Sequence, residues 1–142
     1  MRYAYPYKAT PQPEGGFSIA FPDVPEAISQ GETDAEIHAM AEDALVTALS
    51  FYTDASEPLP VPSPANGLPV AYVPSLVTAK LALHDAMVKG RVSNVTLGQR
   101  LGVDEKVIRR LRDPLHRSHI ANVEAALRTF GQRLLVDVHE SA

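Results

Sequence analysis

The stretch SNVTLGQRLGVDEKVIRRLRD, residues 93–113, predicts two short helices joined by a tight turn. Ser93 is suited to cap the first helix, and Gly102 can adopt the left-handed backbone conformation that the turn needs. Asp104 caps the second helix, which Pro114 prevents from continuing. Apolar residues at helical spacing would hold the two helices at a fixed angle: Leu97, Leu101, Val103, Ile108 and Leu111. The first helix is therefore expected over 94–101 and the second from 105 to about 112.

Further helices are predicted on both sides of this stretch. Residues 75–89 form an amphipathic pattern that Gly90 closes, and residues 118–130 form another that Gly131 ends. Beyond it, Leu134, Val136 and Val138 alternate, which predicts a short C-terminal strand. Residues 75–142 are thus expected to form an all-α domain that ends in one strand.

The second of the two short helices keeps its polar residues for the outer surface: Glu105, Lys106, Arg109, Arg110 and Arg112. In the helix-turn-helix arrangement, the second helix lies in the DNA major groove. We expect Lys106 and Arg109 to reach base edges, with guanine the natural target for arginine, and Glu105 to accept a hydrogen bond from cytosine. The simpler interpretation is a helical hairpin with a solvated basic face.

Other residues of this segment are expected to contact the DNA backbone. Asn94, together with the N-terminal amides of its helix, would hold a phosphate. Salt-dependent backbone contacts are expected from Arg100, Arg110, Arg112 and Arg117. His116 and His119 have the spacing of a metal-binding pair, but no third ligand is evident near them, so no metal site is predicted.

Charge is divided unevenly along the chain, whose net charge is −4. Residues 1–75 contain two basic and ten acidic residues, a net charge of −8, whereas residues 76–142 contain eleven basic and seven acidic residues, a net charge of +4. Five prolines between positions 58 and 69 precede the change of sign and predict a semi-rigid connector over 54–69. A basic surface suits nucleic acid and an acidic one repels it, so the two segments are expected to have different partners.

The first half of the chain predicts a small α+β domain. Tyrosines alternate at positions 3, 5 and 7 in a first strand over 2–10, and aromatic and apolar residues alternate in a second strand over 16–21. A turn with proline and glycine joins them into a hairpin. A third strand is expected around 27–29 and a fourth over 70–73. Thr33 and Glu36 match a capping box, which predicts a helix over 34–52.

Several classes of function are not expected from the composition. Without cysteine, the chain has neither disulfides nor zinc sites built on thiolates. A metal-dependent nuclease needs converging carboxylates, which the first strand lacks, and His38 lies in no Ser–His–Asp arrangement. The chain is therefore not expected to be an enzyme or to need a cofactor. It contains neither a membrane-spanning apolar run nor a secretory signal, so a cytoplasmic protein is expected.

Two resemblances to known families follow from these patterns. Residues 76–130 resemble the XRE-type repressor family in Asn94, in the turn glycine Gly102 and in the pair Ile108 and Leu111, although Gly98 stands where that family usually has alanine. The run EGGFSIAFPDVP, residues 14–25, is followed by AISQGET at 27–33, by the helix, and by LPVPS at 59–63. This order resembles the HicB antitoxins of bacterial type II toxin–antitoxin pairs over nearly the whole chain.

The HicB resemblance implies a partial RNase H-like fold without nuclease activity for residues 1–74, joined to a helix-turn-helix domain over 75–142. It implies a partner, HicA, which is a small basic toxin that cleaves mRNA with a histidine and would be inhibited by covering its active face. Charge and loop position select the candidates for toxin contact: Asp23, Glu26, Glu32 and Asp34. The C-terminal half would repress the chain's own operon as a homodimer or higher oligomer on an inverted repeat of operator DNA, with the C-terminal strand as the candidate pairing element.

Two other functions stay open at this point. A stand-alone transcriptional repressor would use the N-terminal half to sense a ligand or to oligomerise. An RNase H-like nuclease would cleave nucleic acid with a metal, and the missing carboxylates argue against it. A toxic basic protein encoded beside this gene would distinguish the antitoxin from both.

Overall fold

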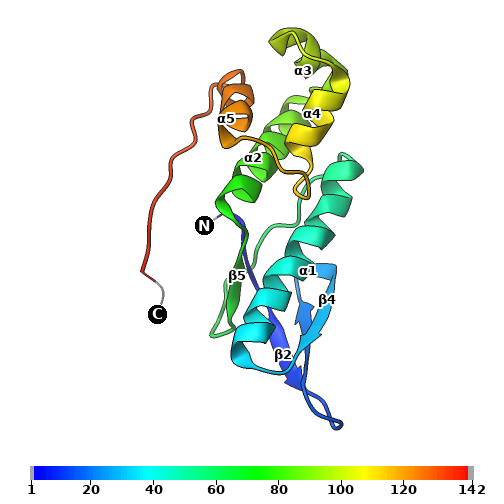
Figure 1. The fold of residues 1–142 in the computed structure, drawn as a ribbon, viewed down its shortest axis with the longest axis vertical. Helices are drawn as coiled ribbons and strands as arrows, with labels where there is room; N and C mark the ends of the chain where they lie inside the picture. The colour runs from blue at the N-terminus through cyan, green and yellow to red at the C-terminus, as the bar shows by residue number, and fades with distance from the viewer. Residues whose placement is uncertain (1, 141–142) are drawn as a thin grey trace. The chain divides into compact units, whose positions relative to one another are not determined.

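The computed structural model describes residues 2–140, and the chain divides into two compact units, Met1–Pro74 (unit 1) and Ser75–Ala142 (unit 2). Unit 1 contains strands and one long helix, whereas unit 2 is helical (Figure 1). The predicted α+β class is confirmed by this combination. Within residues 2–140, every helix is too short or too polar to span a membrane.

The described strands of unit 1 form two antiparallel sheets: β1 (Ala4–Pro6), β2 (Lys8–Pro11), β3 (Phe17–Phe21), β4 (Val24–Gly31) and β5 (Val70–Tyr72). The larger sheet has the order β2-β3-β4, and β1 pairs with β5. The predicted hairpin is confirmed, since Pro11 pairs with Phe17 across its turn. The single strand expected over 2–10 is instead two. The chain changes partner at Tyr7, whose N–H donates to the Pro69 carbonyl at 2.9 Å.

β4 is longer than the third strand expected around 27–29. It begins at Val24 and includes Pro25. Its pairing with β3 is irregular between Ala20 and Phe21. Proline is tolerated because β4 lies at the edge of its sheet and the irregular pairing removes the need for a ladder N–H there.

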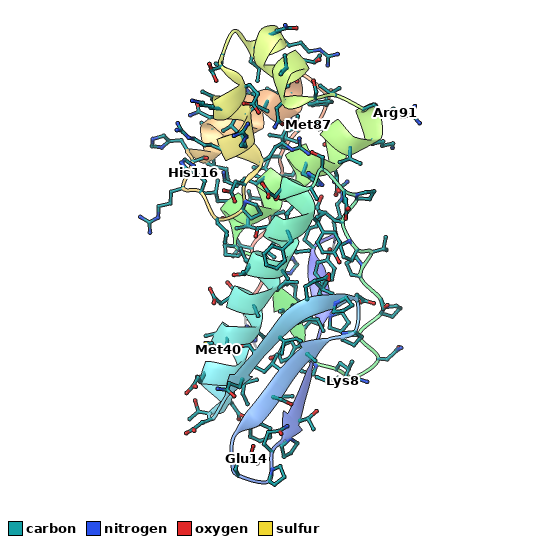
Figure 2. All side chains as sticks on the ribbon, turned by 90° about the vertical axis from the view of Figure 1, so that its right-hand side faces the viewer. Lys8, Glu14, Met40, Met87, Arg91 and His116 are labelled. Carbon is teal, nitrogen blue, oxygen red and sulfur yellow. The ribbon has the colours of Figure 1, made fainter. Side chains whose placement is uncertain are left out.

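Helix α1 (Asp34–Asp54) packs on the strands of unit 1, mainly on β4. The Glu36 N–H donates to Thr33 Oγ1 at 3.2 Å, so the predicted cap is confirmed. One stripe of the helix is buried: Ile37, Ala41, Leu45, Ala48 and Leu49. Met40 lies outside this stripe and is exposed (Figure 2). The helix therefore covers the sheet with one apolar face, as its periodicity predicts.

The proline-rich connector contains neither helix nor strand over 57–69, as its prolines predict. It is held on unit 1 by hydrogen bonds at two points. Tyr5 Oη donates to the Pro60 carbonyl at 2.7 Å. The backbone N–H and Oγ of Ser63 donate to the carboxylate of Asp23 at 2.8 and 2.6 Å. The connector is thus part of the packed surface of unit 1.

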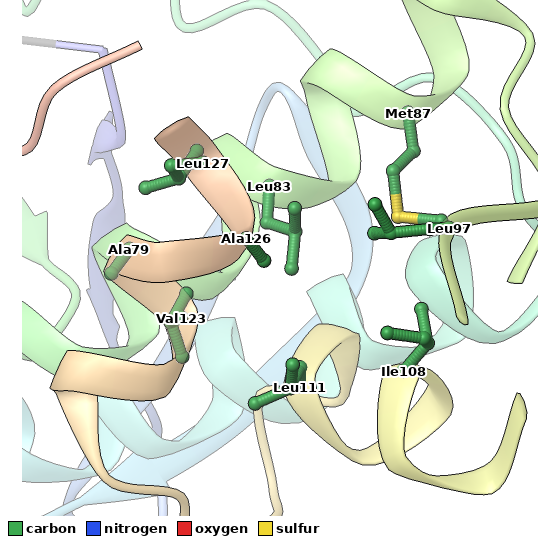
Figure 3. Packing of buried hydrophobic residues seen from close by; sticks show 9 residues of the cluster. All are labelled: Ala79, Leu83, Met87, Leu97, Ile108, Leu111, Val123, Ala126 and Leu127. Atoms are coloured by element: carbon green, nitrogen blue, oxygen red, sulfur yellow. The ribbon is translucent and has the colours of Figure 1, made fainter. Parts of the chain in front are cut away.

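Unit 2 consists of four described helices: α2 (Ser75–Gly90), α3 (Asn94–Leu101), α4 (Glu105–Arg112) and α5 (Ile120–Arg128). They enclose one apolar cluster, in which each helix contributes at least one buried side chain (Figure 3). Its members are Ala79, Leu83, Met87, Leu97, Ile108, Leu111, Val123, Ala126 and Leu127. The helices predicted from caps and glycines are confirmed, with ends that shift by at most two residues.

The predicted C-terminal strand is wrong for the single chain. Residues 132–140 form neither strand nor helix. Leu134 packs against the apolar cluster of unit 2, but Val136 is 70% exposed and Val138 is 88% exposed. A strand requires a partner for its backbone N–H and C=O groups, and this segment of an otherwise helical unit has none within residues 2–140.

Gly98→Ala is expected to destabilise unit 2. A Cβ atom at this position would lie 2.7 Å from the Val103 carbonyl oxygen, which is backbone and is fixed by the turn between α3 and α4. We expect the free energy of unfolding to fall by about 1–3 kcal/mol, because overpacking outweighs the better helix propensity of alanine. Urea denaturation followed by circular dichroism measures the change.

Gly90→Ala is the matched control, because a Cβ there would meet the Val92 side chain at an ordinary 3.5 Å. Equal stability of the two variants would contradict the close approach of α3 to the turn.

Candidate functional site

The α3–α4 segment has a fixed turn and two capped helices. Ser93 Oγ accepts from the Thr96 N–H at 3.1 Å, and Asp104 Oδ1 accepts from the Lys106 N–H at 2.8 Å. Gly102 between them has φ 69° and ψ 33°, the left-handed conformation that favours glycine. Local sequence therefore sets the turn and the starts of both helices. Packing of α3 and α4 against α2 and α5 completes the path of the backbone.

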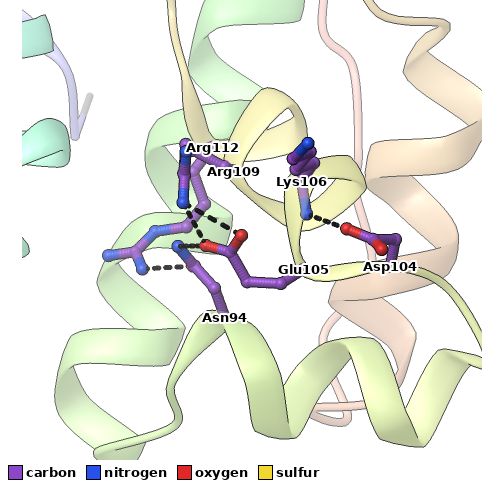
Figure 4. Close-up of polar contacts among 6 residues, drawn as sticks. All are labelled: Asn94, Asp104, Glu105, Lys106, Arg109 and Arg112. Carbon is purple, nitrogen blue, oxygen red and sulfur yellow. Dashed lines mark hydrogen bonds and ion pairs between the residues drawn. The ribbon is translucent and has the colours of Figure 1, made fainter.

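The exposed side of α4 carries a basic surface made of Lys106, Arg109 and Arg110. Glu105 pairs with Arg109 across one helical turn: Arg109 Nη2 lies 2.7 and 2.9 Å from the two carboxylate oxygens (Figure 4). The Arg109 side chain is 63% exposed and that of Glu105 is 28% exposed. A guanidinium has five N–H donors, so this pair leaves donors for a further ligand.

Arg112 does not lie on that surface, and its prediction as an outer-surface residue is wrong. Arg112 is only 5% exposed. Nη2 lies 2.8 Å from His84 Nδ1 on α2, and Nη1 donates to Asn94 Oδ1 at 2.8 Å. Because a guanidinium only donates, His84 Nδ1 accepts, which assigns the ring proton to Nε2. Burial lowers the pKa of Arg112.

Asn94, which was predicted to hold a phosphate, contacts two side chains of α4. Its side-chain oxygen is occupied by Arg112, and its Nδ2 lies 3.5 Å from Glu105 Oε1, at the long limit for a hydrogen bond. Both ends of the amide thus face α4. Arg100 and Arg117 are exposed.

The acidic candidates of unit 1 fall into two pairs. Asp23 holds the connector through Ser63, as described above, and the Glu26 carboxylate accepts from Tyr52 Oη. This hydrogen bond, together with burial, raises the pKa of Tyr52 to about 12.

Glu32 and Asp34, by contrast, lie on either side of the cap residue of α1, and both are exposed. Figure 2 shows that Glu14, another exposed acid, lies at the turn of the β2–β3 hairpin. Of the four predicted toxin contacts, Asp23 and Glu26 make hydrogen bonds within unit 1, whereas Glu32 and Asp34 are exposed at the start of α1. Glu32 and Asp34 are therefore the better candidates for contact with a basic side chain of a partner protein.

Metal-binding geometry is absent from residues 2–140, which contain no cluster of three or more histidine and acidic side chains that could hold an ion. His116 Nδ1 lies 3.3 Å from Ser118 Oγ. His38 Nδ1 lies 3.4 Å from Tyr7 Oη, and their rings are tilted against each other.

Comparison with known proteins identifies the family. The family described as HicB-like antitoxin of bacterial toxin–antitoxin systems matches residues 4–82, more than half of the chain. This chain belongs to the HicB-like antitoxin family. It is 39% identical to "Antitoxin HicB" of Escherichia coli (strain K12) over 131 residues, which cover 92% of this chain and 95% of the relative. The HicB resemblance of the sequence is thereby confirmed.

Other HicB relatives match over similar lengths. "Antitoxin HicB 1" of Photorhabdus laumondii is 34% identical over 134 residues, covering 94% of this chain and 86% of the relative. "Antitoxin HicB" of Pseudomonas fluorescens (strain Pf0-1) is 36% identical over 126 residues, covering 87% of this chain and 86% of the relative. The likeness thus extends through both units of this HicB-like chain.

Sequence reasoning missed two polar residues of α2, Lys80 and His84, both fully buried. Lys80 Nζ donates to the Arg110 carbonyl and to Ser118 Oγ, each at 2.7 Å. It thereby satisfies the C-terminal end of α4, where helix carbonyls lack partners and carry partial negative charge. Lys80 and His84 are four residues apart on the apolar face of α2, and this spacing is the signal that would have found them.

Stability of this HicB-like chain is expected to depend on pH through Lys80. Burial lowers the pKa of Lys80 to about 8, with Asp113 acting in the opposite direction. An unfolded lysine titrates near 10.4, so between these values the unfolded chain binds more protons and the free energy of unfolding rises with pH. Below pH 8 both states are protonated, and the group contributes no pH dependence.

Urea denaturation of the native chain and of Lys80→Met at pH 7, 8, 9 and 10 measures this effect. The difference in unfolding free energy should move in favour of the native chain above pH 8, by at most about 1.4 kcal/mol per pH unit. Titration of the tyrosines affects both proteins equally, so it does not contribute to this difference. A difference that stays constant from pH 7 to 10 would contradict the lowered pKa.

Proposed function

We propose that this chain is an antitoxin that neutralises a small basic mRNA-cleaving toxin of the HicA type and represses its own operon. The observation that carries this proposal is the match to proteins named antitoxin HicB over nearly the full length of both units. The net charges of the units fit these two tasks, since unit 1 has a net charge of −8 and unit 2 a net charge of +4. Both tasks place the protein in the bacterial cytoplasm, where mRNA and operator DNA are found.

Unit 1 is proposed to bind the toxin. Its two antiparallel sheets with one covering helix and its lack of a metal-binding cluster within residues 2–140 support a partial RNase H-like domain without nuclease activity. A surface that binds RNA is basic, so an acidic partner is steered toward it and oriented on it. Apolar contact and shape would supply much of the affinity. Inhibition is then steric, since the bound antitoxin covers the toxin's active face.

Unit 2 is proposed to bind operator DNA as an XRE-like helix-turn-helix domain. The exposed basic surface of α4 supports this assignment, with Lys106 and Arg109 at base edges and Arg110 and Arg100 on phosphates. One recognition helix reads few base pairs, so a two-fold homodimer would read half-sites about 34 Å apart in an inverted repeat. The exposed residues Val136 and Val138 would pair with the second copy as a strand formed only in the dimer.

The proposed function predicts a toxic basic protein encoded beside this chain's gene. Growth of bacteria that express that neighbouring protein tests the proposal. We expect arrest when that protein is induced alone, and recovery when this chain is co-expressed with it. The two proteins should also co-purify. A chain that binds its promoter but neither rescues growth nor binds the neighbour would instead be a stand-alone repressor.

A further inference from the structure

We propose that Asn94 and Arg112 are positioning residues that fix the Glu105–Arg109 pair and so determine which base Arg109 reads. This inference rests on the proposed DNA binding of unit 2. It replaces the phosphate contact that the sequence predicted for Asn94. Five side chains form one chain of polar contacts from the buried face of α2 to the exposed face of α4: His84, Arg112, Asn94, Glu105 and Arg109. Figure 4 shows the last four of them.

The inner end of this polar chain is rigid. Arg112 is 5% exposed, and its guanidinium bridges His84 on α2 and Asn94 at the start of α3, each at 2.8 Å. A buried guanidinium between two acceptors has little freedom, because leaving either one would strand a buried charge without its partner. The Asn94 amide is therefore held in one orientation, with Nδ2 turned toward α4.

The outer end carries the reading residue. Glu105 Oε1 lies 3.5 Å from Asn94 Nδ2 and 2.7 Å from Arg109 Nη2, so this one oxygen faces both side chains. An exposed surface pair of this kind normally moves among several arrangements and contributes little stability. Contact with a fixed amide restricts the carboxylate, and the carboxylate in turn restricts the guanidinium.

Specificity for the operator sequence depends on this restriction of the Arg109 guanidinium. Arginine discriminates guanine by two parallel hydrogen bonds to O6 and N7, and that geometry demands a guanidinium held in one plane. A loosened Arg109 still attracts phosphates, because its charge is unchanged. Loss of the positioning contact should therefore lower affinity for operator DNA more than affinity for DNA of any sequence.

Two substitutions in the full chain test the proposal. Asn94→Ala removes both contacts of the amide. Asn94→Asp keeps an acceptor for Arg112 but replaces the donor that faces Glu105 with a negative oxygen. We expect both variants to lower the ratio of affinities for the chain's own promoter duplex and for a shuffled duplex of the same composition by roughly tenfold. Asn122→Ala, an exposed asparagine of α5, is the matched control and should leave the ratio unchanged.

A second measurement needs no DNA. In NMR relaxation of the arginine Nε–Hε groups, Arg109 should be more ordered in the native chain than in Asn94→Asp, whereas thermal unfolding of that variant should match the native chain. An equal loss of affinity for both duplexes would identify a phosphate contact and overturn the proposal. Unchanged Arg109 order would overturn it as well. A native chain that shows no preference for its promoter would instead refute DNA reading by unit 2, and the NMR comparison would still decide whether Asn94 positions Arg109.

Discussion

Arg109→Ala should lower the preference of this chain for its operator over random DNA by about 1–3 kcal/mol, or roughly 5–150-fold. Arg109 lies on the exposed side of α4 with its guanidinium paired to Glu105, and guanine is the base that arginine contacts most often. Under the proposed DNA binding, the substitution removes a base contact, whereas the remaining arginines still attract phosphates. Affinity for random DNA should fall far less. Quantitative footprinting and competition titrations at one fixed salt concentration measure the two affinities.

Arg128→Ala is a matched control for this prediction. Arg128 and Glu124 on α5 form the same pair, with a 2.7 Å contact and a 66% exposed arginine. The substitution removes the same charge and the same helical ion pair, but from a different helix. An equal loss of selectivity in both variants would contradict the assignment of α4 as the reading helix. Neutralisation of the toxin should be unchanged in Arg109→Ala, because the substitution lies in unit 2.

Reversal of two acids in unit 1 should have the second large effect. In the double variant Glu32→Lys and Asp34→Lys, we expect association with the basic toxin to slow by roughly 10–100-fold at low salt. Both residues are exposed beside the N-terminus of α1. The effect should shrink as salt is added, since exposed charges are screened beyond about 10 Å at 0.1 M. Stopped-flow or surface binding kinetics at several salt concentrations measure it.

The control for this variant has the same change in net charge at other positions. Glu14→Lys with Asp54→Lys alters two exposed acids of unit 1 by the same four charges. If both double variants slow association equally, net charge alone matters and the start of α1 is not the contact. Lysine at the start of a helix costs about 0.3–1 kcal/mol through the helix dipole, which is too little to unfold α1.

Local sequence signals predicted most of the fold. Thr33, Ser93 and Asp104 each cap the helix that they were expected to open, and Gly102 makes the turn. Such signals act within a few residues and need no tertiary information. The pairing of β1 with β5 brings together segments more than sixty residues apart, so alternation alone could not show that the strand at 2–10 divides.

The candidate site was predicted less well, because charge was equated with exposure. Arg112 follows Ile108 by four residues, which places it on the same, buried face of α4. The sequence contained that spacing, but the partners that make burial of an arginine possible, His84 and Asn94, lie on other helices. The C-terminal strand failed for a related reason, since alternation cannot supply the missing partner strand.

Cleavage of RNA by the purified toxin, titrated with the full chain, tests the central proposal most directly. The proposed function predicts that cleavage falls to background once the antitoxin reaches a fixed molar ratio to the toxin, and that Arg109→Ala inhibits as well as the native chain. Undiminished cleavage at a large excess of correctly folded antitoxin would contradict it.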